Sequence, residues 1–149
     1  MKLCNCNKNI WIFQVTIFGH GAGATSVAIH MTSQKSLGLF RSAIIQSLPF
    51  SLPLKTLVEA RAQGQNFSLT LECSNLECMR SKSPWAIIEA QQKTNSQPGT
   101  FLQRLRPWGP HIDNNDVPSD IQVAFRYARI HDIPLLIGTT TADGADLVF

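Results

Sequence analysis

Acidic residues are missing from Met1 to Val58 of this 149-residue chain, and Glu59 is its first carboxylate. The basic residues of that stretch are Lys2, Lys8, Lys35, Arg41 and Lys55. Over the whole chain, 13 basic and 10 acidic residues give a formal net charge of +3 without any run of lysine or arginine. A nucleic-acid-binding surface needs clustered basic residues, so the sequence predicts no nucleic-acid partner.

Long apolar runs are also missing. No stretch approaches the roughly 20 apolar residues of a membrane-spanning helix, and Met1–Cys6 lacks the apolar centre of a signal peptide. We therefore expect these residues to hold neither an export signal nor an anchor. With 44% hydrophobic and 15% charged residues, the chain can bury one core, and we expect residues 1–149 to form one globular domain.

Cysteines are few and fall in two close pairs, Cys4/Cys6 and Cys73/Cys78. Four cysteines allow three pairings, and the second pair fits either a short disulfide of an oxidising compartment or free thiols of the cytosol. The Cys4-x-Cys6 pair is poor evidence for a metal site, because no histidine or further cysteine lies near it. Asn66 opens an N-glycosylation sequon in the same loop-like region, which favours an extracellular domain.

The stretch from Val15 to Val27, VTIFGHGAGATSV, organises the chain. A β-branched run to Phe18 predicts a strand, unbroken as in a sheet buried on both faces. The glycines that follow allow a sharp reversal, and apolar residues at helical spacing from Ala24 to Met31 predict a helix. The sequence therefore predicts a strand, a tight turn and a helix.

Further elements follow in alternation. We expect strands at 43–45 and 134–138, and helices at 55–65 (ending near Gly64), at 81–92 with Ser83 as N-cap, and from Ser119 through Ala128. Prolines make 93–118 loop-rich. Strands alternating with helices predict a parallel α/β sheet with flanking helices.

Two kinds of site use such a corner. The pattern Gly19-x-Gly21-x-x-Ala24 matches a dinucleotide fingerprint, but that site needs an acid about 20 residues on, where this chain has none. We therefore expect no nucleotide cofactor. The nucleophile elbow, G-x-S-x-G, lifts a serine above the sheet. Here Gly21 stands in the position of that serine, and a hydrogen atom cannot attack a carbonyl.

The sequence resembles the type-B carboxylesterases and cholinesterases, whose elbow reads V-T-(I/L)-F-G-E-S-A-G-A-x-S-V. The resemblance continues, in the family's order, through Gly38–Phe40, Ala43–Ser47, Cys73 with Cys78–Arg80, Trp108–Asp113, Ile133–Gly138 and Asp143-Gly144. It implies part of an α/β-hydrolase fold, namely the central and C-terminal portion of the sheet. It also implies that Cys73 and Cys78 form the family's short disulfide loop.

The resemblance assigns degenerate roles at the corner. Gly21 matches the nucleophile, Ala22 the oxyanion-hole N–H, His20 the glutamate before the serine, and Asp143 the triad acid. The family's base histidine lies beyond Phe149 and its oxyanion loop lies upstream, so we expect no functional catalytic residue. Once the base is missing, Asp143 is expected to cap its turn with Gly144.

The pattern G-H-x-A-G-A-T with a short C-x4-C is similar to the family's adhesion members, such as neurotactin and glutactin. It implies an extracellular or plasma-membrane ectodomain that binds a partner protein, and no cofactor or metal. The alternative is a carboxylic-ester hydrolase whose activity is lost only because the chain is incomplete. Asn9–Phe13 runs into the first strand without the family's G-G-D-P loop, which predicts either an extended strand or a fragment or spliced gene model.

The remaining candidates have simpler interpretations. Ser26 lies five residues past Gly21 and would sit on the helix, so we do not expect a displaced nucleophile there. The other histidines, His30, His111 and His131, are expected at the surface or in capping positions, and Trp85 and Trp108 are expected to pack.

Overall fold

A computed structural model of the chain describes residues 15–95, 105 and 107–145. The predictions for Cys4, Cys6 and Asn9–Phe13 lie outside these residues. Contacts within the chain divide it into two compact units, the first made of Met1–Ser51 with Asn114–Phe149 and the second of Leu52–Asp113. The first unit contains the sheet and the second contains helices and loops.

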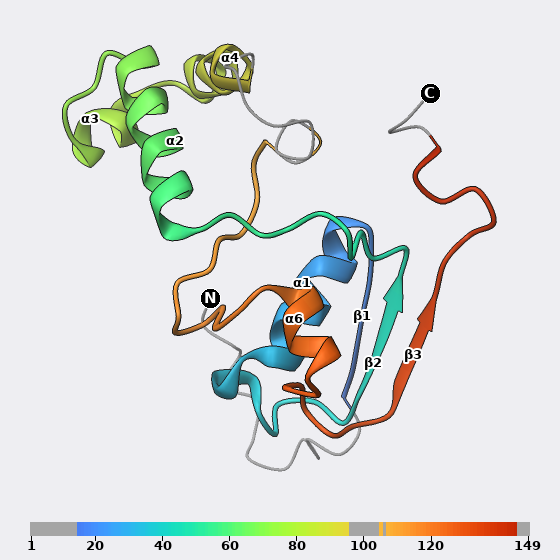
Figure 1. Cartoon of the computed structure of the whole chain (residues 1–149). Helices are drawn as coiled ribbons and strands as arrows, with labels where there is room; N and C mark the ends of the chain where they lie inside the picture. The colour runs from blue at the N-terminus through green and yellow to red at the C-terminus, as the bar shows by residue number, and fades with distance from the viewer. Residues whose placement is uncertain (1–14, 96–104, 106, 146–149) are drawn as a thin grey trace. The chain divides into compact units, whose positions relative to one another are not determined.

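The sheet of the first unit has three parallel strands, β1 (Thr16–His20), β2 (Ser42–Gln46) and β3 (Leu135–Gly138), in the order β1-β2-β3 (Figure 1). Their register aligns Phe18, Ile44 and Leu136 in one row across the sheet. All three strands were predicted from β-branched or apolar runs, and their parallel pairing confirms the predicted α/β class.

Helix α1 (Ala22–Thr32) packs on β1 and β2, and the short helices η2 (Gln34–Ser36) and α6 (Ile121–Arg126) lie next to it (Figure 1). The core lies between α1 and the sheet, where Met31 and Ile45 are completely buried. The other buried apolar residues of this unit are Ala24, Val27, Ala28, Phe40, Ala43, Leu48, Val117, Ile121 and Ala124. Burial of this apolar stripe of α1 is the main stabilisation that the sequence pattern predicts.

Among the described residues, side chains on the opposite face of the sheet are exposed to solvent. Phe18 is 75% exposed and Leu136 is 65% exposed, and both lie in the same row of the register. The prediction that the first strand is buried on both faces is therefore wrong for the part of the chain that the structure describes. An apolar run predicts an apolar environment on both sides, but it does not specify which segment provides it.

The second unit contains α2 (Leu57–Thr70), α3 (Leu76–Ser81) and α4 (Pro84–Asn95). Its small core consists of Leu71, Cys73 and Ala90, against which Phe67 and Ile87 pack. A disulfide joins Cys73 to Cys78, with their Cα atoms 5.6 Å apart, which confirms the pairing that the family resemblance implies. The disulfide fixes the turn between α2 and α3 beside this core.

The end predicted for the first helix of this unit is wrong. A capping box opens α2, because the Thr56 side chain accepts the Glu59 N–H while the Glu59 side chain accepts the Thr56 N–H. The helix then passes through Gly64 and ends at Thr70. Glycine costs a helix about 1 kcal/mol relative to alanine, which capping and the packing of Phe67 offset. Asn66 consequently lies in a helix and not in a loop.

Other helix boundaries shift by one to three residues. The Ser83 hydroxyl accepts the Ala86 N–H at 3.2 Å, which confirms the predicted cap of α4. The predicted cap Ser119 is wrong, because the Asp120 carboxylate accepts the Gln122 N–H at the start of α6. That helix stops before Ala128, which has a positive φ of 51°.

Residues 107–113, the last part of the second unit, pack within this unit without forming a helix or a strand of the sheet. The Pro107 carbonyl accepts hydrogen bonds from the side chains of Lys55 and Gln63, and Trp108 contacts Phe67 edge to face with 5.3 Å between ring centroids. The prediction that Trp108 packs is confirmed. Among the described helices, none has the length and apolar character needed to cross a membrane.

Candidate active-site corner

Gly21 forms the corner between β1 and α1, with φ 56° and ψ −112°. Its N–H donates to the Gln46 carbonyl at 3.1 Å, and its own carbonyl accepts the Thr25 N–H at 3.0 Å. The first bond ties the corner to the neighbouring strand, and the second is a first-turn bond of α1. The chain therefore reverses from strand to helix at a single residue with positive φ, as a nucleophile elbow does.

The three glycines of the corner have three different physical roles. A Cβ atom on Gly19 would lie 2.3 Å from the backbone carbon and oxygen of Gly23, so the turn has no room for a side chain there. A Cβ on Gly21 would meet nothing within 4 Å, and only its positive φ disfavours other residues. A Cβ on Gly23 would also meet nothing within 4 Å, and its φ is ordinary. The corner requires glycine at 19 for space and favours it at 21 for conformation.

The residues that the resemblance matches to the family's site lie around this corner. None of those described next has the contacts of a nucleophile and its base. His20 is exposed at the end of β1, and Ala22 is exposed in the first turn of α1. Ser26 lies one turn further along α1, where its hydroxyl donates to the Ala22 carbonyl at 3.2 Å. It thus lies on the helix, as expected, and not on the turn.

Asp143 lies in a turn that follows β3. Its carboxylate accepts the Thr140 N–H at 3.3 Å, its own N–H donates to the Thr140 carbonyl at 3.4 Å, and Gly144 follows with φ 82°. The structure therefore gives the carboxylate a local contact within its own turn. Gly21 and Asp143 follow strands of one parallel sheet, at the carboxyl ends where α/β folds place their ligand sites.

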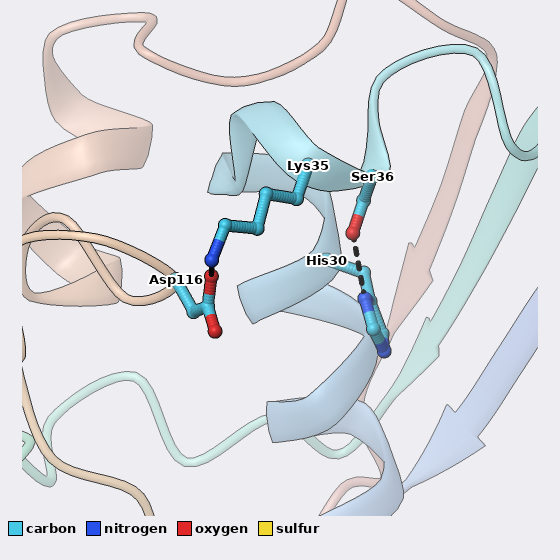
Figure 2. Close-up of polar contacts among 4 residues, drawn as sticks. All are labelled: His30, Lys35, Ser36 and Asp116. Atoms are coloured by element: carbon cyan, nitrogen blue, oxygen red, sulfur yellow. Dashed lines mark hydrogen bonds and ion pairs between the residues drawn. The ribbon is translucent and has the colours of Figure 1, made fainter. Parts of the chain in front are cut away.

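Two other polar pairs of the first unit lie at the carboxyl end of α1 (Figure 2). The His30 Nδ1 atom lies 2.9 Å from the Ser36 hydroxyl, and Lys35 pairs with Asp116 at 2.5 Å. The serine and histidine have the spacing of a nucleophile and its base. Ser36 is only 6% exposed, so this hydroxyl is closed to a substrate and acts as a structural contact.

His131 takes a capping position, which is one of the two positions predicted for it. It is 7% exposed, its Nε2 lies 3.0 Å from the Ser33 carbonyl, and its ring packs against Phe40. Its backbone N–H donates to the Met31 carbonyl at 2.8 Å. This histidine is therefore buried and caps the carboxyl end of α1, and it connects that end to the segment before β3. Within the described ranges, no group of three or more potential metal ligands is present.

The parallel sheet with a helix on one face and the single-residue corner of positive φ at the end of β1 match the strand, turn and helix of an α/β-hydrolase nucleophile elbow. A model of the carboxylesterase family matches residues 13–149. The chain belongs to the carboxylesterase family.

Individual relatives agree with this assignment. The chain is 36% identical over 146 residues to the crystal protein of Dictyostelium discoideum, a match that covers 93% of this chain and 26% of that protein. Over 69 residues it is 42% identical to neurotactin of Drosophila melanogaster, covering 46% of this chain and 8% of neurotactin.

Among solved structures, a carboxylesterase of Geobacillus stearothermophilus superimposes with a TM-score of 0.68 at 28% identity, covering 89% of this chain and 26% of that enzyme. The chain therefore spans about a quarter of the length of the crystal protein and of this enzyme.

Proposed function

We propose that this chain is a catalytically inactive carboxylesterase-like domain that acts in cell adhesion by binding a partner protein. The proposal is supported by Gly21, which the sequence resemblance matches to the family's nucleophile and which turns the chain from strand to helix with φ 56° and ψ −112°. Acyl transfer needs a nucleophilic atom at that point, and glycine has none. The scaffold is thus retained without the atom that reacts.

The surroundings of Gly21 support the same conclusion. An elbow serine needs a histidine to accept its proton, but His30 contacts Ser36 and His131 is buried against Phe40. The exposed His20 is the remaining histidine at the corner, and it occupies the position of the family's glutamate. Asp143 accepts a hydrogen bond within its own turn.

An exposed aromatic residue supports a recognition function. Trp85 was expected to pack, but it is 74% exposed in the first turn of α4. Ile88 lies one helical turn further on and is also exposed, so the two side chains share a face of the helix. Tryptophan is enriched among residues that dominate protein-protein binding energies. The similarity to neurotactin favours a partner at the cell surface.

Catalytic inactivity is tested by incubating the purified chain with p-nitrophenyl acetate and with a fluorescent organophosphate. We expect no turnover and no labelled serine. The Gly21→Ser variant should also lack turnover, because no histidine follows Asp143 in this sequence. Stoichiometric labelling of any serine in the unsubstituted chain would contradict the proposal and would favour a hydrolase with another nucleophile.

The recognition function is tested by displaying the chain on non-adherent cells and measuring aggregation with cells that express candidate partners. We expect Trp85→Ala to reduce aggregation. Val58→Ala is the matched control, because Val58 is equally exposed in the same unit but lies on α2. Equal loss of aggregation in both variants would show that Trp85 has no specific role.

A further inference from the structure

We propose that Asn66 carries an N-linked glycan, that the glycan is attached before the second unit folds, and that it covers an exposed apolar face of α2. This inference rests on the extracellular location within the proposed function. It differs from that function in its site and in its chemistry. Asn66 and Ser68 both lie on α2.

Asn66 is available for modification in the folded chain. It is exposed on α2, and its backbone carbonyl accepts the Thr70 hydroxyl at 2.8 Å. No contact of its side-chain amide is found among the described residues. The inward face of the helix is formed instead by residues such as Gln63 and Phe67, which contact Pro107 and Trp108. Asn66 lies about 100° from Phe67 and about 200° from the partly buried Ser68 around the helix axis, so a glycan on Asn66 would project away from the side of α2 that these two residues pack.

Ser68, the residue that completes the sequon, is engaged by the fold. Its hydroxyl donates to the Cys73 carbonyl, and its side chain is partly buried. Residues two apart in a helix point about 200° apart around the axis, so the Asn66 amide and the Ser68 hydroxyl lie on opposite sides. The enzyme that transfers the oligosaccharide must bind the asparagine and the hydroxyl together. It therefore cannot bind and glycosylate the sequon while the sequon is helical. Attachment must therefore precede the formation of α2.

The chemistry requires one co-reactant, an oligosaccharide linked through a diphosphate to a lipid. The Asn66 Nδ2 atom forms a bond to the anomeric carbon of the sugar, and the bond from that carbon to the phosphate oxygen breaks. The lipid diphosphate leaves with the bonding electrons, and the amide proton passes to a carboxylate of the transferase. No group of the chain is oxidised or reduced.

The Cys73–Cys78 disulfide provides a way to test whether glycosylation of Asn66 precedes the folding of α2. The carbonyl that holds Ser68 belongs to Cys73, which is bonded to Cys78. Closing this short loop fixes Cys73 beside the end of α2, where its N–H also donates to the Ser68 carbonyl at 3.0 Å. Disulfide formation therefore favours the structure in which the sequon cannot be read. Removing both cysteines should leave the sequon readable for longer.

The glycan would cover apolar surface. Ala62 and Leu69 lie four residues before and three residues after Asn66, so all three share one face of α2. Leu69 is 76% exposed. A hydrated oligosaccharide between these residues would shield them from other chains, which is one way to prevent association through exposed apolar side chains.

The experiment translates the full chain, fused to a cleavable secretory leader, into microsomes and measures a mobility shift that an N-glycosidase removes. Asp116→Thr completes a reporter sequon at the exposed Asn114, which shows that the chain has entered the lumen. We expect one further glycan that Asn66→Gln abolishes, and a higher fraction of glycosylated Asn66 when Cys73→Ser and Cys78→Ser are combined.

Each outcome decides one part of the inference. A glycan on the reporter but none on Asn66, with or without the cysteines, would overturn the site. Glycosylation of Asn66 to the same extent in both forms would overturn the order of events. If Asn66 were modified only after removal of the cysteines, disulfide formation would be shown to prevent glycosylation. The proposal that the natural chain carries the glycan would then be rejected. The leader supplies export, so these results are independent of whether the chain mediates adhesion.

Discussion

Replacing Gly21 with alanine tests the corner conformation most directly. The residue has φ 56° and ψ −112°, a region that side chains with a Cβ rarely adopt. Such a conformation costs about 1–3 kcal/mol for a residue other than glycine. The added methyl group meets nothing within 4 Å, so a steric clash contributes nothing. For a chain of about 150 residues, this cost lowers Tm by roughly 2–12 °C.

The two neighbouring glycines are matched controls with opposite expectations. Gly23→Ala adds a methyl group in open space within α1 and should raise stability by about 0.4–1 kcal/mol. Gly19→Ala places a methyl group 2.3 Å from the Gly23 backbone and should be the most destabilising of the three. Thermal unfolding followed by circular dichroism gives the ranking. If Gly21→Ala were as stable as Gly23→Ala, the claim that the corner retains an elbow conformation would be refuted.

Three further predictions concern the second unit. Glu72 has φ 54° at the end of α2, so Glu72→Gly should stabilise the chain by about 1 kcal/mol in urea unfolding; a loss of stability would contradict the left-handed geometry. Thr56→Ala removes half of the capping box and should cost about 0.5–2 kcal/mol, whereas Thr56→Ser should cost little. Reducing the Cys73–Cys78 disulfide, which closes a short loop, should cost about 2 kcal/mol on the chain-entropy estimate, and an unchanged unfolding midpoint under reductant would show that the loop is already ordered.

The elements that the sequence predicted well are those determined by local patterns. The strand, corner and helix from Val15 to Met31 combine a β-branched run, closely spaced glycines and helical periodicity, and each signal favours the structure observed. The cap at Ser83 follows from the same local chemistry, because a serine before a proline satisfies the first N–H groups of a helix. Such signals need no knowledge of distant residues.

The elements that were mispredicted depend on contacts from elsewhere in the chain. Gly64 appeared to end a helix, but Phe67 beyond it packs against Trp108, and that contact extends α2 to Thr70. His131 was expected at the surface or in a capping position, and no local pattern could show that it is buried and caps α1 at Ser33, which is 98 residues earlier. A sequence pattern shows which residues can pack, and only the fold shows which of them meet.

Glycine at position 21 also affects the stability of the corner. In the enzymes that the sequence resembles, a serine occupies the corner, where its positive φ carries a cost that catalysis justifies. Glycine adopts the same φ without that cost, and the tie from the Gly21 N–H to Gln46 is unaffected because it involves only the backbone. Glycine at this corner therefore avoids that strain and keeps the reversal that positions α1 on the sheet. We therefore expect the corner to be more stable with glycine at position 21 than with serine there.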